Sequence, residues 1–253
     1  MTKMKDVCRA FKTINTHKGQ TKIHVALAGE EVTKQALLIM EELGKGIVVE
    51  PFVPTVLMFG GLLAHGNNDS LKTSYLPRII AGDCLGAFAF LERQSRFEMT
   101  DIKTTALVDG DRLIINGDKT VVFNGANADA LVVAVRTGSE QFDRQGISLV
   151  LVDAITPGLE FTEYPMMDGQ KAANIRFADV SVSRDCLLGP VGEGMDIVDK
   201  VIPEVLLALC AEALGIMATL NETTVNYTKT RNQFGVPISS FQVLQHRMVD
   251  NFM

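Results

Sequence analysis

Residues 227–245 carry the densest group of side chains that could bind a ligand, set around a Gly-x-Pro break. The group comprises Arg231, Gln233, Phe234, Phe241 and Gln242. A guanidinium beside a glycine break at a helix end can pair bidentately with a phosphate, which suits Arg231. Phe234 and Phe241 can stack on the flat face of an adenine ring, and Gln242 can offer amide donors and acceptors to its edge. This stretch is therefore the first candidate for a binding site.

The same residues also have purely structural interpretations. An arginine at a helix C-terminus complements the helix dipole and pairs with nearby carboxylates, which would account for Arg231. Phe234 and Phe241 can equally fill a core between helices. His246, in the helical run that follows, is more typical of packing or an interface than of catalysis. Taken alone, the residues leave both interpretations open.

The composition is that of a soluble enzyme, and it argues against several other classes. The chain has 253 residues, 47% of them hydrophobic and 21% charged, which is enough for one large domain or two smaller ones. Its net charge of −6 argues against nucleic acid or an anionic membrane as the main partner, because both need clustered cations. No uninterrupted apolar run approaches the roughly 18 residues of a membrane span.

Cysteine and histidine usage narrows the chemistry further. The cysteines are scattered without a C-x-x-C spacing and no signal peptide precedes them, so we expect reduced thiols in a cytoplasmic protein. No His, Cys or carboxylate cluster has metal-ligand spacing, and neither a Ser-His-Asp arrangement nor a Walker loop is evident. The sequence therefore predicts no metal site.

The elements that would position these residues begin with helices. Apolar residues recur at three- and four-residue spacing over residues 31–43 and predict an amphipathic helix. A second apolar run covers residues 55–65. Asn68 is suited to cap a third helix, which Gly82 would end. We expect residues 1–86 to form part of an N-terminal helical domain.

From about residue 87 the apolar period falls from about four to two, which is typical of strands. Strands are expected at residues 104–108, 112–115, 119–123, 130–136, 147–152 and 172–177. Asp109-Gly110 predicts the turn of a hairpin, and Asn116-Gly117 and Asn124-Gly125 predict the next two turns. Residues 87–190 are thus predicted to be a middle β domain, an antiparallel sandwich or barrel.

After a glycine-rich segment the helical period returns. A long helix rich in Ala and Leu is expected over residues 201–227, and Gly235-Val236-Pro237 would end it. Ser239-Ser240 can cap the next helix, whose pattern continues to the last residue without a stop signal. We expect residues 191–253 to be part of a C-terminal helical domain and the chain to be truncated.

The order of helices, strands and helices, together with several motifs, resembles the acyl-CoA dehydrogenase superfamily over about residues 31–253. The motifs are Glu41-Glu42-Leu43-Gly44, Asn116-Gly117-Asp118-Lys119, Pro157-Gly158, Gly192-Glu193-Gly194, Arg231-Asn232-Gln233-Phe234-Gly235 and Phe241-Gln242-Val243-Leu244-Gln245. Residues 92–96 and 244–247 are most similar to the small subunits of pimeloyl-CoA-type dehydrogenases. The resemblance implies an α+β fold with N-terminal helices, a middle antiparallel β sandwich or barrel, and a C-terminal helical bundle that is incomplete here.

The resemblance also implies FAD as the cofactor. Arg231 would contact its pyrophosphate across a subunit interface, with Gln233, Phe234, Phe241 and Gln242 around the same cofactor. The family's Thr-Glu-Pro-x-Ala-Gly-Ser-Asp loop is replaced here by residues 91–98, and its Trp-Ile-Thr by residues 121–123. Hydroxyl groups are thereby lost at Leu91, Phe97 and Phe123. This loss weakens the expected flavin binding by the chain's own β domain.

Two weaker site candidates also rest on the resemblance. Arg93 and Arg96 are suited to an acidic substrate such as a dicarboxylyl-CoA, or to a CoA phosphate, with solvated surface arginines as the alternative. Glu204 lies one residue from Val205, the position that aligns with the catalytic base of some relatives. Since one residue turns a helical side chain by about 100°, the alternative is a surface or capping carboxylate beside Pro203.

The implied function is that of a subunit of an FAD-dependent acyl-CoA dehydrogenase in fatty acid metabolism. The enzyme would dehydrogenate an acyl-CoA thioester at its α and β carbons and pass electrons to an electron-transfer flavoprotein. The alternative is a non-catalytic partner that completes or stabilises the active site of a larger dehydrogenase subunit in a hetero-oligomer. Self-association is a further possibility for its oligomeric state.

Overall fold

The computed structural model describes the backbone of residues 30–252 and side chains from residue 35 onward. The chain divides into two compact units. The sheet unit contains Val49–Val205, and the helical unit contains Thr33–Val48 and the chain from Leu206 onward. Predictions for residues 1–29 lie outside the described residues.

Helical segments precede the strands of the sheet unit. They are the π-helix η2 (Val53–Gly60), α3 (Gly61–His65) and α4 (Asp69–Ala81). The predicted start of α4 is confirmed, because the Asn68 side chain accepts a hydrogen bond from the Leu71 N–H at 3.2 Å. Gly82 ends α4 in the left-handed conformation, as predicted.

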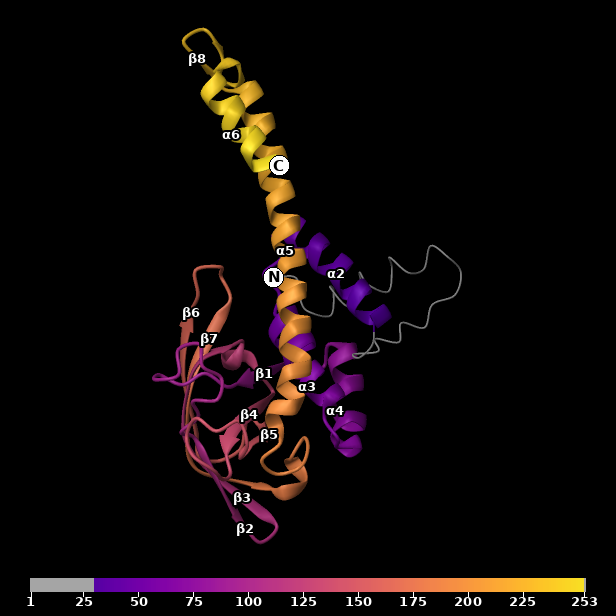
Figure 1. Cartoon of the computed structure of the whole chain (residues 1–253), viewed down its shortest axis with the longest axis vertical. Coiled ribbons are helices and arrows are strands. Elements are labelled where there is room, and N and C mark those ends of the chain that lie inside the picture. The colour runs from indigo at the N-terminus through magenta and orange to yellow at the C-terminus, as the bar shows by residue number, and fades with distance from the viewer. Residues whose placement is uncertain (1–29, 253) are drawn as a thin grey trace. The chain divides into compact units, whose positions relative to one another are not determined.

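The β region is one seven-stranded sheet that curls strongly (Figure 1). Its strands are β1 (Gly86–Ala89), β2 (Thr105–Asp109), β3 (Arg112–Phe123), β4 (Ala130–Arg136), β5 (Ile147–Asp153), β6 (Leu159–Pro165) and β7 (Lys171–Ser183). The order is β1-β4-β2-β3-β7-β6, with β5 paired to β4. Most pairs are antiparallel, as predicted, but β1 pairs with β4 in parallel, so the sheet is mixed.

Two predicted turns differ from the structure. The β2–β3 hairpin is confirmed, but its two-residue turn is Gly110-Asp111, because Asp109 pairs with Arg112. Asn116-Gly117 is not a turn, since β3 runs through it. The register between β3 and β7 shifts there instead, and Gly117 has a φ of 146°. A glycine within a strand often marks such a bulge.

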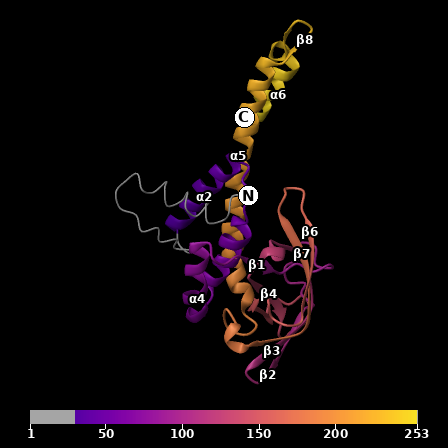
Figure 2. The ribbon, with the colours of Figure 1, turned by 180° about the vertical axis from the view of Figure 1, so that it is seen from behind.

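The sheet unit buries apolar residues on both faces of the sheet. The segments η2, α3 and α4 and the first turns of the helix α5 (Gly194–Thr230) cover one face, visible from both sides in Figures 1 and 2. On the other face the curled strands pack against one another around residues such as Leu113, Ile115 and Val133. The predicted α+β class is confirmed.

One long helix, α5 (Gly194–Thr230), follows the sheet. The sequence predicts that the helical period returns after the glycine-rich segment, and α5 begins there, at Gly194, ahead of the run over residues 201–227; Pro203 does not interrupt it. By length and composition alone α5 could cross a membrane: its most apolar window has a mean hydropathy of 2.0, and 28% of that window is buried. The expectation from the sequence rests only on uninterrupted apolar runs, none of which is long enough to span a membrane. Measured by mean hydropathy over a window instead, α5 is long and apolar enough, so that expectation does not hold for α5.

The helical unit combines the later part of α5 with elements from both ends of the chain. They are α2 (Glu30–Lys45), β8 (Asn232–Gln233), β9 (Val236–Pro237), η5 (Ile238–Ser240) and α6 (Gln242–Phe252). The backbones of α2 and α5 approach closely at two glycines. A Cβ at Gly44 would overlap the Glu212 carbonyl, and one at Gly215 would overlap the Glu41 carbonyl. The predicted serine cap of α6 is wrong, since Ser240 Oγ donates to the Pro237 carbonyl at 2.7 Å.

Candidate functional site

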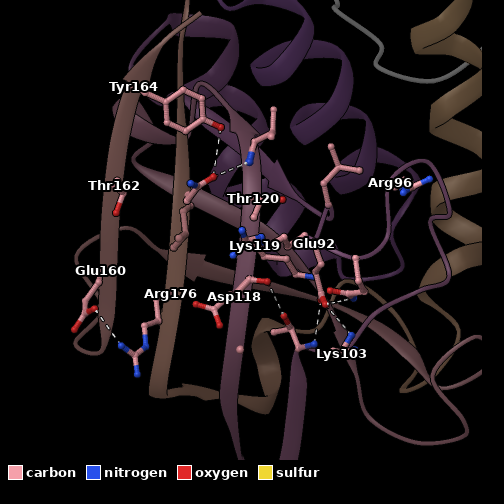
Figure 3. Close-up of a pocket in the computed structure, with 18 residues that line it drawn as sticks. Glu92, Arg96, Lys103, Asp118, Lys119, Thr120, Glu160, Thr162, Tyr164 and Arg176 are labelled. Atoms are coloured by element: carbon pink, nitrogen blue, oxygen red, sulfur yellow. Dashed lines mark hydrogen bonds and ion pairs between the residues drawn. The ribbon is translucent and has the colours of Figure 1, made fainter.

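A pocket of about 1140 Å³ opens on the sheet unit, over β3, β6 and β7 (Figure 3). Its lining includes cationic side chains (Arg93, Arg96, Lys103, Lys119 and Arg176), acidic side chains (Glu92, Asp118 and Glu160) and uncharged polar side chains such as Thr120, Thr162, Tyr164 and Asn174. Ligand pockets commonly measure about 300–1,000 Å³, so an elongated ligand fits this volume. The segment that follows β1, residues 90–104, forms one wall and is called the pocket loop below.

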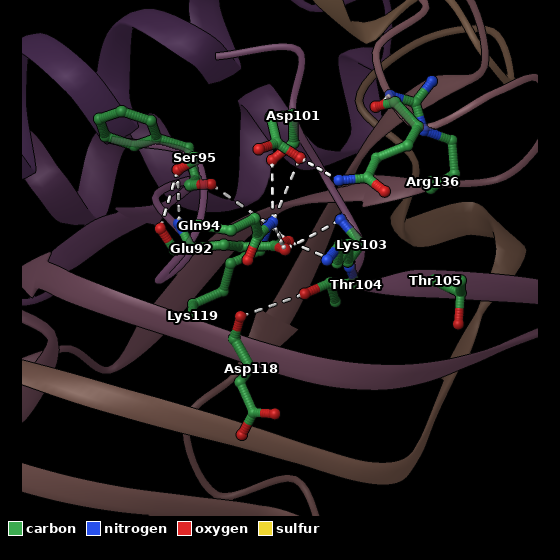
Figure 4. Close-up of polar contacts among 12 residues, drawn as sticks. Glu92, Gln94, Ser95, Asp101, Lys103, Thr104, Thr105, Asp118, Lys119 and Arg136 are labelled. Atoms are coloured by element: carbon green, nitrogen blue, oxygen red, sulfur yellow. Dashed lines mark hydrogen bonds and ion pairs between the residues drawn. The ribbon is translucent and has the colours of Figure 1, made fainter. Parts of the chain in front are cut away.

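The Glu92 carboxylate holds the pocket loop (Figure 4). One oxygen accepts hydrogen bonds from Gln94 Nε2 and the Lys103 N–H, both at 2.9 Å. The other accepts from the Thr104 N–H at 3.0 Å and from Lys119 Nζ at 2.7 Å. A single carboxylate therefore joins the beginning of the pocket loop, its end and strand β3.

The Glu92–Lys119 pair is buried, with side-chain exposures of 4% and 0%. Desolvation acts to raise the pKa of the Glu92 carboxyl, but the Lys119 ammonium and the hydrogen bonds that the carboxylate accepts outweigh it and lower that pKa to about 2. Burial lowers the pKa of Lys119 to about 8, although Glu92 acts in the opposite direction. Both groups are therefore charged at neutral pH.

Arg136 supplies a second anchor for the same loop. Its guanidinium donates to the Thr100 carbonyl at 2.8 Å, and to the carbonyls of Gln141, Asp143 and Gln145 at 2.6–2.8 Å. Burial lowers its pKa. Four backbone carbonyls thus accept from the two terminal nitrogens of the guanidinium, while Nε has no partner among the described residues, and the loop after β4 is tied to the pocket loop.

The floor of the pocket contains a strained residue. Val121 has a φ of 50°, which is rare for a β-branched side chain, and the β3–β7 register shifts beside it. Its N–H donates to Asn174 Oδ1 at 3.2 Å, and Tyr164 Oη donates to the same oxygen at 3.4 Å. Backbone strain of this kind clusters at ligand sites.

Several residues singled out from the sequence lie at this pocket. Arg93 and Arg96 both line it, as does Leu91. Phe97 belongs to the pocket loop, and its side chain is 99% exposed. Phe123 does not line the pocket. The structure therefore brings the two predicted substrate arginines together, while their binding role stays a prediction.

The predicted cofactor residues lie together in the helical unit. Arg231, Gln233, Phe234 and Gln242 are exposed, and Phe241 is half-buried. The Phe234 and Phe241 rings meet edge to face, with centroids 6.3 Å apart at 86°. Phe234 is 92% exposed, so it does not fill a core among the described residues. Within that part of the chain, Arg231 forms no ion pair.

The candidate base Glu204 lies outside the pocket. Its carboxylate is 3.4 Å from Nε2 of His65, and its side chain is 37% exposed. Its neighbour Val205 is buried at 5% exposure. The structure thus places Glu204 beside a histidine of α3, and its role as a base stays a prediction.

The interpretation of the sequence missed the pairing of Glu92 with Lys119. One signal was available, because Leu113, Ile115 and Lys119 share one parity along β3 and all three are buried. Strand alternation thus predicts an inward lysine, which needs a buried acidic partner. Among the described residues, no group of three or more His, Cys, Asp or Glu side chains could hold a metal ion.

Comparisons with known proteins found family matches for both the strand-rich middle part and the C-terminal helical part of the chain. Residues 87–180 match the family model for the middle domain of acyl-CoA dehydrogenases, and residues 192–251 match the model for their C-terminal domain. Together these ranges cover more than half of the chain.

Individual relatives agree with the family models. The chain is 30% identical over 219 residues to the human mitochondrial short-chain specific acyl-CoA dehydrogenase, covering 84% of this chain and 53% of that protein. It is 31% identical over 228 residues to an acyl-CoA dehydrogenase of Bacillus subtilis, covering 88% of this chain and 60% of that protein. The crystal structure of an acyl-CoA dehydrogenase from Geobacillus kaustophilus superposes with a TM-score of 0.79 at 29% identity, covering 86% of this chain and 58% of that one. The chain thus spans 53–60% of the length of these relatives.

Proposed function

The chain belongs to the acyl-CoA dehydrogenase family, and from that premise we propose that it works as a subunit of an FAD-dependent acyl-CoA dehydrogenase. The pocket of the sheet unit carries the proposal. Arg93, Arg96 and Lys103 form no ion pairs with described residues, and they border a wall of hydroxyl and amide groups. Such a pocket suits a ligand with an anionic part and a neutral polar part, as a CoA thioester has.

In α,β-dehydrogenation a carboxylate base takes a proton from Cα while a hydride leaves Cβ. A bound FAD would supply the hydride acceptor for this reaction, and an electron-transfer flavoprotein would serve as the electron acceptor of the assembled enzyme. Within this chain, Arg93, Arg96 and Lys103 would hold a phosphate or a terminal carboxylate. Glu92 is unsuited as the base, because its oxygens are engaged by four donors and its pKa is lowered to about 2.

The residues fit FAD unequally in the two units. In the helical unit, Arg231 offers an exposed guanidinium for a pyrophosphate and Phe234 an exposed ring for an adenine. In the sheet unit, Leu91 and Val121 line the pocket without a hydroxyl group, and the hydroxyl groups present come from other positions such as Thr120, Thr162 and Tyr164. We therefore propose that the helical unit reaches an FAD held mainly by another subunit.

The second candidate function is a non-catalytic partner in a hetero-oligomer, which completes or stabilises the active site of a larger subunit. Two observations favour it: Glu204 contacts His65 outside the pocket, and Phe97 exposes an aromatic ring where relatives carry a hydroxyl group. The unpaired cysteines Cys84, Cys186 and Cys210 are compatible with the proposed cytoplasmic location.

The visible absorbance of the purified chain distinguishes the two candidates. The spectrum is recorded for the chain alone and after mixing with a larger dehydrogenase subunit and free FAD, followed by gel filtration. Oxidised flavin retained by the chain alone would exclude the partner function. Flavin retained only by the mixture agrees with an FAD held mainly by another subunit and leaves the partner function standing, and a chain that retains neither flavin nor the larger subunit contradicts both candidates.

Substrate class is tested on whichever assembly retains flavin. Turnover of a dicarboxylyl-CoA is compared with that of a monocarboxylic acyl-CoA of equal chain length, for wild type and for Arg93→Gln/Arg96→Gln. If these arginines bind a terminal carboxylate, the double variant loses the dicarboxylyl substrate selectively. If they bind CoA phosphates, the double variant loses turnover of both substrates to the same extent.

A further inference from the structure

Glu92 and Lys119 both line the pocket, but their side chains are buried and pair with each other, so the pair has no role in the proposed reaction. We propose that this pair is a positioning device that fixes the conformation of the pocket loop and so presents Arg93 and Arg96 to the pocket. The ligand served by the pocket rests on the proposed function. The positioning of the loop does not.

The first argument is that one carboxylate holds both ends of the loop. Glu92 accepts from the backbone N–H groups of Lys103 and Thr104, eleven and twelve residues later in the chain. Lys119 bonds the same carboxylate and also donates to the Phe90 carbonyl at 3.3 Å. The loop is thereby closed onto the middle of β3.

The second argument is that the turn carrying the arginines starts at the backbone of Glu92, so it lies where the Glu92 side chain holds the chain in place. Ser95 donates to the Glu92 carbonyl through its N–H at 3.1 Å and its hydroxyl at 2.9 Å. The Glu92 N–H donates to Ser95 Oγ at 3.0 Å. Arg96 then has a φ of 48°, a conformation that residues other than glycine rarely adopt. The surrounding contacts must hold such a residue in place.

The third argument separates positioning from simple packing. Two apolar side chains of similar volume can replace a buried ion pair without loss of stability. They cannot accept hydrogen bonds from the Lys103 and Thr104 N–H groups. The double variant Glu92→Met/Lys119→Met therefore keeps the packing of the site while it removes the anchors of the loop.

Limited trypsin digestion of the full chain, followed by mass spectrometry, measures the loop without any ligand. Arg93 and Arg96 are exposed cleavage sites within the loop, and Arg184 is an exposed reference site outside it. In the double variant we expect cleavage after Arg93 and Arg96 to accelerate at least about tenfold relative to cleavage after Arg184, because proteolysis reports local opening. Tyr75→Phe is the matched control, since it removes the hydrogen bond that Tyr75 on α4 donates to Asp153 at the end of β5, and it should leave this ratio unchanged.

The outcomes decide the proposal. A ratio equal to that of wild type overturns it, and so does equal acceleration at all sites, which would indicate a general stabilising role. If the double variant does not fold, Glu92→Gln gives the same decision: it keeps the side-chain shape but replaces one acceptor oxygen by an amide donor, and an unchanged ratio there also overturns the proposal.

A binding measurement with coenzyme A then connects the loop to the proposed function. If wild type binds coenzyme A, the double variant should bind about tenfold more weakly, because the arginines are no longer held in place. Equal affinity of the two proteins contradicts the presentation of the arginines to the pocket. If wild type does not bind coenzyme A, the proposed ligand is wrong, while the digestion result still decides whether the pair positions the loop.

Discussion

The sheet unit and the helical unit differ in how completely they bury their own side chains. In the sheet unit even the ammonium of Lys119 is fully enclosed, and Arg136 Nε is the single buried side-chain nitrogen or oxygen without a partner among the described residues. In the helical unit several large apolar side chains are more than half exposed, namely Leu206, Leu214, Met217, Leu220, Val243 and Phe252. The sheet unit also exposes single large apolar side chains, such as Phe97 and Ile155, but those of the helical unit lie together on α5 and α6 and form apolar surface suited to further helices.

The two candidate sites, the pocket and the predicted FAD residues, lie in different units and are therefore affected differently by this contrast. The pocket belongs to the unit whose polar groups are satisfied internally, so its geometry is set by contacts such as Glu92–Lys119. The predicted FAD residues around Arg231 belong to the unit with open apolar surface. An incomplete helical surface is what a contributing subunit would offer to a neighbour. The predictions below test this contrast, beginning with the largest expected effect.

Removing one member of the buried ion pair should have the largest effect. Glu92→Leu leaves Lys119 buried without its counter-ion, and we expect the free energy of unfolding of the sheet unit to fall by about 3–5 kcal/mol. Urea denaturation measures the loss, and the Glu92→Met/Lys119→Met double variant is the control. A loss below about 1 kcal/mol would mean that the pair is not closed to water, and the contrast between the units would weaken.

A methyl group at Gly215 should disturb the helical unit. The added Cβ overlaps the Glu41 carbonyl, so α2 must move away from α5, at a cost of about 1–3 kcal/mol. Circular dichroism during thermal unfolding measures the change. Gly138→Ala is the matched control, because a Cβ there meets nothing within 4 Å. Equal stability of the two variants would contradict the close approach of α2 and α5.

Acid should destabilise the sheet unit through Glu92. The folded-state pKa of about 2 lies below the ordinary value of 4.5, so the carboxylate contributes its full stability above pH 4.5. That contribution declines as the pH falls from 4.5 towards 2. Urea midpoints measured across this window for wild type and Glu92→Gln should converge at its acidic end. If the urea midpoints of the two proteins instead fall in parallel as the pH decreases, Glu92 is not the group that causes the loss of stability in acid.

Charges on the exposed apolar surface should change association rather than folding. Leu214→Lys/Leu220→Lys alters side chains that are 58% and 54% exposed, so we expect less self-association. Stability should stay within about 0.5 kcal/mol per substitution. Sedimentation velocity provides the measurement. Leu107→Lys, at a 70% exposed position of the sheet unit, is the control and should leave the oligomeric state unchanged.

The smallest effect on stability is expected for Arg231→Ala. The side chain is exposed, so the free energy of unfolding should change by less than about 0.5 kcal/mol. FAD retention by the assembled complex should nevertheless fall, because a guanidinium that pairs with a pyrophosphate is lost. Arg247→Ala, at another exposed position, is the control. Unchanged FAD retention would remove the main predicted cofactor contact.

Much of the architecture followed from local sequence patterns. The cap at Asn68 and the stop at Gly82 fix α4, since both act within a few residues of the helix ends. Short apolar segments between turn signals located strands β2, β4 and β5. The motifs also indicated the family, because each is a short run of residues in the right order. Local conformation and local motifs are therefore determined by the sequence itself.

Other features were decided only by contacts between distant residues. Asn116-Gly117 has the composition of a turn, yet its pairing with β7 keeps it inside β3 as a bulge. From the sequence, Gly44 is a helix end signal and Gly215 is an ordinary helix residue. The structure shows that α2 and α5 approach each other at these two glycines, where a Cβ would overlap the facing backbone. Glu92 and Lys119 lie 27 residues apart, and their charges become a buried pair only when the loop closes on the strand. The sequence determines which residues can make such contacts, but tertiary packing decides which of them lose water and meet, because desolvation depends on the whole surrounding structure.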